Sequence, residues 1–402
     1  MSSGNAIPTI AQHSAHGQAP EQPAILQIVP SLDAGGAERS TIDVAGALAR
    51  AGFVPLVAAS GGRMVDELQS VGGRWIALPV HAKSPQTLAA NVVRLRNLIR
   101  TQNIKLVHAR SRAPAWSAFL AARMAGIPFV TTYHGIYKAK SDLKRFYNSI
   151  MARGDAVIAN SEWTAAHINR EYRFRPKRLV VIPRGVDFQL FDPSRVSVER
   201  VQALQAKWGV QPGQTVVLLP GRLTRLKGQA VLIEALARLK DAHALGHVRA
   251  VLAGDAQGRS AYEAEIHDLI AAHGLDGAVV IGGHVNDMPA AYLAADVVVS
   301  ASTEPEGFGR TTAEAGAMGR PVIATDHGGS REIVAPEKTG LLVPPGDVAE
   351  LAEALRRLLT ESAELRGAMG AAARAHIAER YTIDRMCADT LALYRDLLTE
   401  RT

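Results

Sequence analysis

Short apolar segments alternate with helical patterns along almost the whole chain, and this alternation constrains the fold more than any other feature. Continuous apolar strands separated by helices are typical of parallel sheets that are covered on both faces. The first series of expected strands comprises residues 24–29, 54–60, 74–79, 104–109, 127–135, 155–161 and 178–185. The second series comprises residues 215–223, 248–255, 277–285, 296–303, 320–329 and 340–347.

The segment 186–214 has no strand pattern and separates the two series. A chain of 402 residues is long enough for about two domains. After the last strand, helical patterns cover 348–378 and 383–398. We therefore predict an α/β fold with two doubly wound parallel sheets, divided into a polar, disordered tail (1–23), a first domain (24–190), a second domain (191–382) and a C-terminal helix (383–402).

Composition narrows the class of protein. The single cysteine, Cys387, excludes an internal disulfide framework. No apolar run approaches the ~18 residues that a membrane-spanning helix needs. The first 23 residues lack the charged segment and apolar core of a secretory signal. We therefore expect a cytoplasmic protein.

Positive charge is concentrated in the first half of the chain. Residues 24–190 contain 23 Lys and Arg against 10 Asp and Glu, whereas residues 191–402 contain 22 against 27. A basic first domain indicates a polyanionic partner, either nucleic acid or an anionic membrane surface. A solvated basic surface without a partner is the alternative. The basic segments lack aromatic residues at a recognisable motif spacing, which argues against nucleic acid.

The loop 221–228 follows the first strand of the second domain and leads into a helix. Ligands of open parallel sheets bind at the carboxyl ends of strands, so loops of this kind are candidate sites. Gly221 allows close backbone approach, and Arg222 and Lys227 place two cations beside a helix N-terminus. This arrangement suits a diphosphate. The alternative is a turn with solvated basic residues.

The loop 304–315 follows the strand 296–303 and carries two carboxylates. Glu306 precedes the tight turn Gly307-Phe308-Gly309, and Glu314 lies in the helix that begins at Arg310-Thr311. Carboxylates accept hydrogen bonds from sugar hydroxyls, and free amides at a helix N-terminus bind phosphate. The alternative is that Glu314 only compensates the helix dipole.

Two features of the first domain lie at the same strand ends. Gly35-Gly36 follows the first strand, and His134 ends the strand 127–135. Amides at Gly35-Gly36 can approach a phosphate or a sugar, although a Gly pair alone is a weak signal. It is not a dinucleotide fingerprint, because the only G-x-G is Gly307-x-Gly309 and Thr312 replaces its third glycine. A single histidine is as compatible with a structural role as with a functional one.

Several motifs are missing. The sequence contains no Asp-x-Asp, no Walker A loop, no G-x-S-x-G and no H-E-x-x-H. We therefore predict no metal site and no cofactor. If a diphosphate leaves during the reaction, its charge must be met by Arg222, Lys227 and backbone amides.

Together these features resemble the family 4 retaining glycosyltransferases, over almost the whole chain after residue 24. The most specific parts are Arg222…Lys227 and Glu306-Gly307-Phe308-Gly309…Glu314, in the family's order and spacing. The supporting motifs are Gly35-Gly36-Ala37-Glu38, His134-Gly135, Asn160-Ser161, Gly185-Val186-Asp187, and Gly328-Gly329 with Glu332. The resemblance implies the GT-B fold, in which two Rossmann-like domains face each other across a cleft.

The resemblance also implies roles for individual residues. The second domain would bind a UDP- or GDP-sugar, and the first would be the acceptor side. The catalytic residues implied are His134, Arg222, Lys227 and Glu306. Donor binding would involve the diphosphate (Arg222, Lys227), the sugar hydroxyls (Glu306), the ribose (Glu314), the distal phosphate (amides of Phe308, Gly309, Arg310 and Thr311), the base (Gly283, His284, Val285), and a donor phosphate bordering the acceptor (Gly35, Gly36). Arg310 departs from the family, in which many members have an apolar residue there.

The implied chemistry is transfer of a hexosyl or N-acetylhexosaminyl group with retention. Positive groups would stabilise the departing diphosphate, which would itself receive the acceptor's proton. Members with a GGAER-type motif often build bacterial envelope glycans such as lipopolysaccharide, so the acceptor implied is lipid-linked or an oligosaccharide. Basic residues Lys138, Lys140, Lys144 and Arg145 fit such an acceptor at an anionic inner leaflet, where the protein would be peripheral. In this fold the terminal helix crosses back onto the first domain.

Two other functions remain as alternatives. A sugar-nucleotide epimerase can share the GT-B architecture and would need no acceptor. A noncatalytic protein that binds nucleotide sugars or nucleic acid would use the basic domain only.

Overall fold

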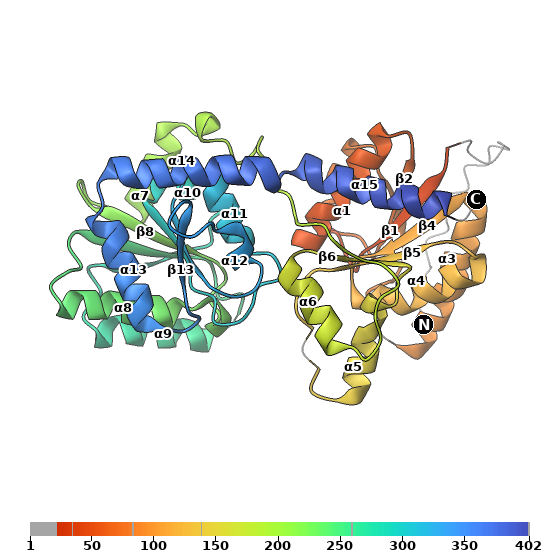
Figure 1. Ribbon diagram of the computed structural model, residues 1–402, viewed down its shortest axis with the longest axis horizontal. Helices are drawn as coiled ribbons and strands as arrows, with labels where there is room; N and C mark the ends of the chain where they lie inside the picture. Colours follow the sequence, from red (N-terminus) through yellow and green to blue (C-terminus); the bar gives the residue numbers. More distant parts are fainter. Residues whose placement is uncertain (1–21, 34, 83, 138, 259, 401–402) are drawn as a thin grey trace, which may run out of the picture.

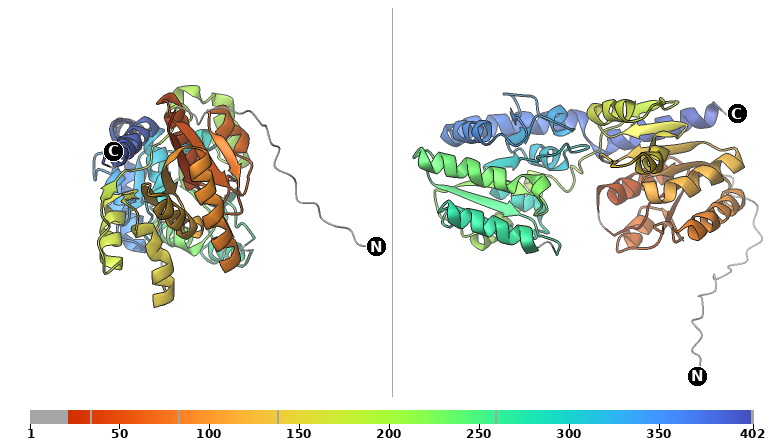
Figure 2. Two further views of the ribbon diagram at one scale, coloured as in Figure 1. Left: turned by 90° about the vertical axis from the view of Figure 1, so that its right-hand side faces the viewer. Right: turned by 90° about the horizontal axis from the view of Figure 1, so that it is seen from below.

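The computed structural model describes residues 22–33, 35–82, 84–137, 139–258 and 260–400. Within these residues the chain forms two parallel sheets, each flanked by helices, and the two units lie side by side (Figures 1 and 2). The predicted α/β fold with two Rossmann-like domains is confirmed. Residues 1–21 of the tail that we predicted to be disordered lie outside the described residues. Lys138 lies outside them as well. The carbonyl of Pro23 accepts a hydrogen bond from the Val54 amide.

The first sheet has the strand order β3-β2-β1-β4-β5-β6-β7, and every neighbouring pair is parallel. Its strands are β1 (Ala24–Ile28), β2 (Val54–Ala59), β3 (Arg74–Ala77), β4 (Ile104–Ala109), β5 (Phe129–Tyr133), β6 (Ala156–Ala159) and β7 (Leu179–Val181).

The second sheet repeats this topology with the order β10-β9-β8-β11-β12-β13, again in parallel. Its strands are β8 (Thr215–Pro220), β9 (Val248–Ala253), β10 (Val279–Gly283), β11 (Val297–Ser300), β12 (Val322–Thr325) and β13 (Gly340–Val343). The strand order reverses direction between β1 and β4, and between β8 and β11. Such switch points are where open parallel sheets bind ligands.

The helices begin at polar capping residues in several cases: the side chains of Ser84, Ser141, Ser161, Ser362 and Thr382 each accept an amide hydrogen bond. The first domain contains α1 (Gly36–Arg50), α2 (Val65–Ser70), α3 (Pro85–Thr101), α4 (Arg112–Ala125), α5 (Asp142–Ser149), the 3₁₀ turn Ile150–Ala152 and α6 (Glu162–Glu171). The later part contains the 3₁₀ turns Pro193–Arg195 and Arg225–Lys227 and the helices α7 (Val198–Lys207), α8 (Gln229–Asp241), α9 (Ser260–Ala272), α10 (Met288–Ala294), α11 (Arg310–Ala317), α12 (Ser330–Ile333), α13 (Val348–Thr360), α14 (Ala363–Arg380) and α15 (Ile383–Thr399).

Both faces of each sheet are buried, as the continuous apolar strands predict. In β8, Val217 and Leu219 belong to one core cluster, whereas Val216 and Leu218 belong to another. The alternation follows from the two-residue period of a strand, which directs successive side chains to opposite faces.

The helical pattern predicted for 348–378 corresponds to two helices with a short break between them. Glu361 adopts an extended conformation (φ −66°, ψ 151°) and ends α13. Ser362 then caps α14 by accepting a hydrogen bond from the amide of Leu365. The apolar periodicity continues on both sides of this break, so periodicity alone does not reveal it.

The chain crosses between the domains twice, and the two crossings lie side by side. Val186 and Thr382 form an isolated parallel β-bridge. The Val186 amide donates to the Tyr381 carbonyl over 2.7 Å. A Cβ atom at Gly185 would lie 2.3 Å from the backbone nitrogen of Ile383, so glycine is required for this close approach.

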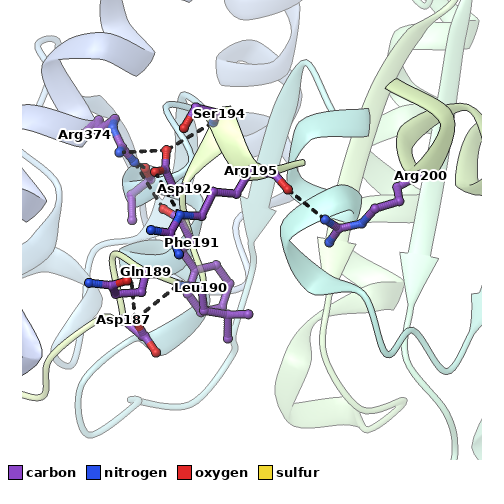
Figure 3. Close-up of polar contacts among 10 residues, drawn as sticks. Asp187, Gln189, Leu190, Phe191, Asp192, Ser194, Arg195, Arg200 and Arg374 are labelled. Carbon is purple, nitrogen blue, oxygen red and sulfur yellow. Dashed lines mark hydrogen bonds and ion pairs between the residues drawn. The ribbon is translucent and has the colours of Figure 1, made fainter. Parts of the chain in front are cut away.

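The segment after the first crossing is anchored to the second domain (Figure 3). The Asp187 carboxylate accepts hydrogen bonds from the amides of Gln189 (2.8 Å) and Leu190 (3.1 Å). Arg374 of α14 donates to the Phe191 carbonyl over 3.2 Å. The Phe191 ring packs near Tyr292 in the core of the second domain.

After the second crossing, α15 packs on the first domain, and α14 and α15 together extend across both units (Figure 1). Leu391 and Tyr394 of α15 are buried in one cluster with Ile25 and Leu106 of the first sheet. Arg178 also pairs with Asp396 over 2.7 Å. No helix among the described residues is long and apolar enough to cross a membrane.

Candidate functional site

The loops that follow β8 and β11 lie next to each other, because these strands are neighbours at the switch point of the second sheet. The amide of Thr303 donates to the Leu226 carbonyl over 3.0 Å, and the Thr303 hydroxyl donates to the Arg225 carbonyl over 3.2 Å. These bonds hold the two loops together at the carboxyl ends of their strands.

Lys227 and Glu306 form an ion pair between these two loops. The Lys227 ammonium donates to Oε1 of Glu306 over 2.7 Å, and the side chains are only 22% and 21% exposed. The Ser302 hydroxyl donates to the same oxygen. Burial alone would raise the pKa of Glu306, but the charge and hydrogen bond of Lys227 and the bond from Ser302 hold it below its usual value. Glu306 is therefore an ionised carboxylate.

Two glycines place the Lys227 side chain. Gly221 has φ +150°, and a Cβ atom there would lie 3.3 Å from Cδ of Lys227, so the lysine stem runs over this glycine. Gly228 has φ +73°, and its Cβ atom would lie 1.9 Å from the Ala301 carbonyl oxygen. Arg222 is exposed, while its carbonyl accepts a hydrogen bond from Gln229. The structure thus leaves the Arg222 side chain at the rim and holds Lys227 inward.

Glu314 lies one helical turn into α11 and is also held by side chains. Its Oε2 accepts a hydrogen bond from the Tyr292 hydroxyl over 2.9 Å, and Arg310 approaches its Oε1 to 3.4 Å. Burial raises the pKa of Glu314, against the lowering effects of Arg310 and of the bond from Tyr292. Glu314 is therefore fixed in place rather than being a solvated first-turn residue.

The turn Gly307-Phe308-Gly309 is shaped by a positive φ and by close packing. Gly309 has φ +95°, and a Cβ atom there would lie 2.5 Å from Oγ of Ser330. The Phe308 ring is buried against Tyr381, with ring centroids 5.7 Å apart. Only the backbone of Phe308 therefore remains for a ligand.

This turn also contacts the first domain. The Gly307 carbonyl accepts hydrogen bonds from the hydroxyls of Ser161 (2.6 Å) and Thr164 (3.2 Å) at the start of α6. A Cβ atom at Gly307 would lie 3.0 Å from the His134 carbonyl oxygen. The loops carrying His134 and Glu306, from different domains, are thus brought together.

A second contact between the domains is made by Glu332. Its carboxylate accepts hydrogen bonds from the amides of Glu162 (2.9 Å) and Trp163 (2.7 Å), which are the first two residues of α6. It therefore compensates the N-terminus of a helix in the other domain. Burial raises the pKa of Glu332, although both amide bonds act in the opposite direction.

His134 contacts an arginine that we did not predict to be part of the site. Its Nδ1 lies 2.8 Å from Nη2 of Arg184, and its Nε2 is buried without a hydrogen-bond partner among the described residues. Burial, Arg184 and Arg110 lower the pKa of His134 well below the usual value. A Cβ atom at Gly36 would lie 1.9 Å from Nη1 of Arg184.

The three residues expected near the base lie at the end of β10, beside the loop after β9. Asp255 of that loop lies 3.7 Å from Nδ1 of His284, and its carbonyl accepts a hydrogen bond from the Leu223 amide over 2.9 Å. Gly283 ends β10 with φ +68°, and no atom lies within 4 Å of the position of its missing Cβ. His284 is exposed and contacts Asn286 over 2.9 Å, whereas Val285 is buried in the core. The backbone at Gly283 is thus open to a flat ligand, at the edge strand of the sheet.

Sequence analysis gave Asn160-Ser161 as a supporting motif without a contact to the second domain, and it missed Ser302, Tyr292 and Arg184 as parts of the site. Ser161 caps α6, a position where serine is favoured. Ser302, four residues before Glu306, also follows a strand. Tyr292 and Arg184 had no such signal, since a tyrosine in a helix and an arginine after a strand are common.

Comparison with known families supports a single assignment for both domains. Residues 34–190 match the model of "Glycosyltransferase Family 4", and residues 201–376 match that of "Glycosyl transferases group 1". A protein named D-inositol 3-phosphate glycosyltransferase from Arthrobacter sp. (strain FB24) is 30% identical over 322 residues, which are 77% of this chain and 74% of the relative.

Solved structures agree. A glycosyltransferase from Rickettsia africae is 33% identical with a TM-score of 0.85, covering 94% of this chain and 99% of that one. Anabaena HepE in complex with UDP is 26% identical with a TM-score of 0.79, covering 93% and 100%. HepE has also been solved with UDP-glucose, at 28% identity and a TM-score of 0.77, covering 92% and 99%. These neighbours confirm the GT-B fold.

Proposed function

Since the chain belongs to glycosyltransferase family 4 and is a sugar-transferring enzyme, we propose that its donor is a UDP- or GDP-sugar and that it transfers a hexosyl or N-acetylhexosaminyl group with retention of configuration. The observation that carries this proposal is the ion pair of Lys227 and Glu306. It places a cation for phosphate and a carboxylate for hydroxyls at adjacent strand ends. The UDP and UDP-glucose complexes of HepE support a nucleotide-sugar donor.

The second domain, 191–382, would hold the donor. Arg222 and Lys227 would bind the diphosphate, and the amides from Phe308 to Thr311 would bind its distal phosphate. A lysine has three N–H donors, so Lys227 can keep its bond to Glu306 and still bind an anion. Glu314 would bind the ribose, and the backbone at 283–285, which is open at Gly283, would lie against the base.

The first domain, 24–190, would present the acceptor. His134 would contact the donor sugar, and Gly35-Gly36 would border the donor phosphate. As the bond between the anomeric carbon and the phosphate oxygen breaks, negative charge grows on the diphosphate. Cations placed there stabilise the transition state more than the ground state. The departing phosphate would take the proton of the acceptor hydroxyl on the same face of the sugar.

The donor is tested by adding UDP, GDP, ADP and their sugars to the protein and measuring its melting temperature. The correct nucleotide should raise this temperature through binding to the folded state. Transfer is then measured with that sugar, and the anomeric configuration of the product is read by NMR. An inverted product would contradict retention. Epimerised sugar and free nucleotide without an acceptor would indicate the epimerase alternative.

We also propose that transfer needs no metal ion, because the carboxylate pair that usually holds a metal diphosphate is missing from the sequence. Activity should survive an excess of EDTA. Complete loss of activity that Mg²⁺ or Mn²⁺ restores would contradict this.

For the acceptor we propose a lipid-linked or oligosaccharide acceptor in the synthesis of an envelope polysaccharide such as lipopolysaccharide, at the cytoplasmic face of the inner membrane. Support comes from α5, where Leu143 is 79% exposed and Phe146 is 55% exposed. Lys140, Lys144 and Arg145 lie beside them. Exposed apolar side chains among cations suit an anionic lipid surface.

The membrane proposal predicts binding to vesicles that contain anionic lipid, weakened by salt. Replacing Leu143 with serine should reduce binding while leaving the melting temperature unchanged, because this side chain is 79% exposed. Equal binding to neutral vesicles would contradict the proposal that the basic residues bind anionic lipid. An acceptor panel should contain lipid-linked saccharides, free oligosaccharides and inositol phosphate, the last because of the name of the Arthrobacter relative.

A further inference from the structure

The contact between Arg184 and His134 determines where the histidine carries its proton. Nη2 of Arg184 lies 2.8 Å from Nδ1 of His134. A guanidinium remains protonated in proteins and has no acceptor atom. Nδ1 must therefore be the acceptor and cannot carry a proton. A neutral imidazole ring then has its only proton on Nε2.

The position of Arg184 is set by the start of α1. Arg184 follows β7, and its Nη1 occupies the space where Gly36 has no side chain, only 1.9 Å from the position of a Cβ atom. Any larger residue at position 36 would displace the guanidinium. The nearby Glu38 carboxylate acts favourably on the charge of Arg184. Gly36 thus makes room for an arginine, a role that differs from the amide contact with phosphate expected from the sequence.

The surroundings of His134 disfavour a charged ring. Burial is the largest cause that lowers the pKa of His134, and Arg184 after β7 and Arg110 after β4 add to it. Two further titratable neighbours are Tyr137, whose hydroxyl bonds to the His134 backbone, and His108 of β4, which is bonded to Thr132 of β5 and to Tyr394 of α15. Across the cleft, Arg310 of α11 adds further positive charge near Arg184. The pKa of His134 is thus lowered by burial, by Arg184 and Arg110 and by His108, and no carboxylate among the described residues opposes them.

The free nitrogen of the ring is the one that carries the proton. Nε2 of His134 is buried and has no hydrogen-bond partner among the described residues. His134, Arg110, Asn160 and Arg184 line a cavity of about 20 Å³. The rest of its lining includes apolar side chains such as Ile158 and Met386, and a cavity of this size has room for about one water-sized oxygen atom. A buried N–H group without a partner is costly, so it marks a place where an oxygen acceptor is expected.

We propose that Arg184 is a positioning residue that holds His134 as a neutral ring with its only proton on Nε2, so that His134 donates a hydrogen bond to a ligand oxygen and does not act as a base. In the reaction, which rests on the function proposed above, that oxygen belongs to a sugar hydroxyl. The proton of the acceptor hydroxyl must then pass to the departing phosphate oxygen. The bond from the anomeric carbon to phosphate breaks, and the bond to the acceptor oxygen forms.

The protonation state is tested by NMR on the full chain labelled with ¹⁵N-histidine, with the His134 signals assigned from the variant His134→Gln. In the native protein we expect an unprotonated Nδ1 and a protonated Nε2 at every pH from 5.5 to 8.5. In Arg184→Met the ring should populate both neutral tautomers, whereas burial and Arg110 should still hold the pKa of His134 below its usual value. Arg184→Lys, which keeps a donor without an acceptor, should restore the native signals.

A matched control is Arg178→Met, which removes the same charge near the opposite end of β7, where Arg178 pairs with Asp396. Its His134 signals should stay native. A protonated Nδ1 in the native protein, or native signals in Arg184→Met, would overturn the proposal. If Arg184→Met does not fold, Gly36→Ala displaces the guanidinium without changing its charge and should produce the same spectral change.

The kinetic consequence is a lower kcat in Arg184→Met. Native kcat should show no loss attributable to His134 between pH 5.5 and 8.5. Arg184→Met should lower kcat throughout this range, because part of its His134 then carries the proton on Nδ1, and Arg184→Lys should regain most of the loss. An acid limb in the native enzyme that disappears in His134→Gln would overturn the proposal. If no sugar transfer is found at all, the proposed function fails, whereas the NMR result still decides the role of Arg184.

Discussion

The ammonium of Lys227 lies 2.7 Å from the Glu306 carboxylate, so the cation expected at the diphosphate and the carboxylate expected at the sugar form one pair. The pair joins the loops after β8 and β11. Because both side chains are about four-fifths covered, removing one leaves the other charge partly buried and unpaired. The two residues therefore act as a unit, and their variants should not have additive effects.

Replacing Lys227 with methionine should lower kcat by about 10²–10³-fold, because losing one donor to a developing negative charge costs ~2.7–4 kcal/mol. The donor KM should change much less. Steady-state kinetics with varied donor measures both. Arg225→Met is the matched control, since Arg225 lies in the same 3₁₀ turn but pairs with the exposed Glu265. Near-native transfer by Lys227→Met with every donor would refute the diphosphate assignment.

Glu306→Gln should reduce turnover while leaving the binding of free nucleoside diphosphate within about threefold, because the carboxylate is assigned to the sugar. Calorimetric titration with nucleotide and initial-rate assays separate the two effects. The double variant with Lys227→Met should lose less than the product of the two single losses. A large loss of nucleotide affinity in Glu306→Gln would place this carboxylate at the nucleotide instead.

Glu332→Gln should weaken the contact between the domains, because a neutral amide compensates the amides of Glu162 and Trp163 less well than a carboxylate. We expect a cost of about 1–3 kcal/mol in this contact. We expect a larger radius of gyration, measured by solution scattering, and a lower kcat/KM, measured by initial-rate assays. Glu337→Gln is the control, because Glu337 pairs with Arg357 on the surface of the second domain. Unchanged scattering in Glu332→Gln would show that this contact does not hold the domains together.

Gly185→Ala should destabilise the protein, because its Cβ atom would lie 2.3 Å from the backbone of Ile383 and force the two crossings apart. Strain of this kind typically costs about 1–3 kcal/mol. Thermal unfolding is the measurement. Gly367→Ala in α14, where no atom lies within 4 Å of the new Cβ, should be neutral or slightly stabilising. Equal melting temperatures for the two variants would contradict the steric argument.

Stability should depend on pH through Asp43 of α1, where burial raises the pKa to about 7. A carboxyl group with a raised pKa in the folded state stabilises the protein at low pH, and this contribution is lost as the pH rises through about 7. The free energy of unfolding of Asp43→Asn, relative to that of the native protein, should therefore increase as the pH rises from 4 to 8, by at most about 4 kcal/mol. Denaturant unfolding at several pH values measures the difference. A difference that is constant with pH would contradict the raised pKa.

The order of the strands along the chain and the positions of the site loops were predictable from sequence. Buried parallel strands are continuous apolar runs, and such runs locate β8 and β11 to within a few residues. Lys227 and Glu306 were found because they follow these strands, where ligands of parallel sheets bind. Their placement needed only local information and the general topology of parallel sheets.

The break at Glu361 was not predictable from the helical pattern, although Ser362 supplied a cap signal that the pattern obscured. The packing of α15 on the first domain came from the resemblance to a family. An amphipathic helix requires an apolar surface, but its periodicity does not say which of two domains supplies that surface.

The chain by itself determined which segments become strands and helices, which loops carry charge at strand ends, and hence the fold class and the residues proposed for phosphate and sugar. Only the tertiary structure decided that Lys227 bonds to Glu306, that Glu332 caps α6 and that Arg184 occupies the space beside Gly36. The physical reason is distance along the chain. Local structure follows from the period of apolar residues and from capping residues. The contacts named above join residues that are between 79 and 170 positions apart, so they depend on how the two sheets and the two crossings pack together.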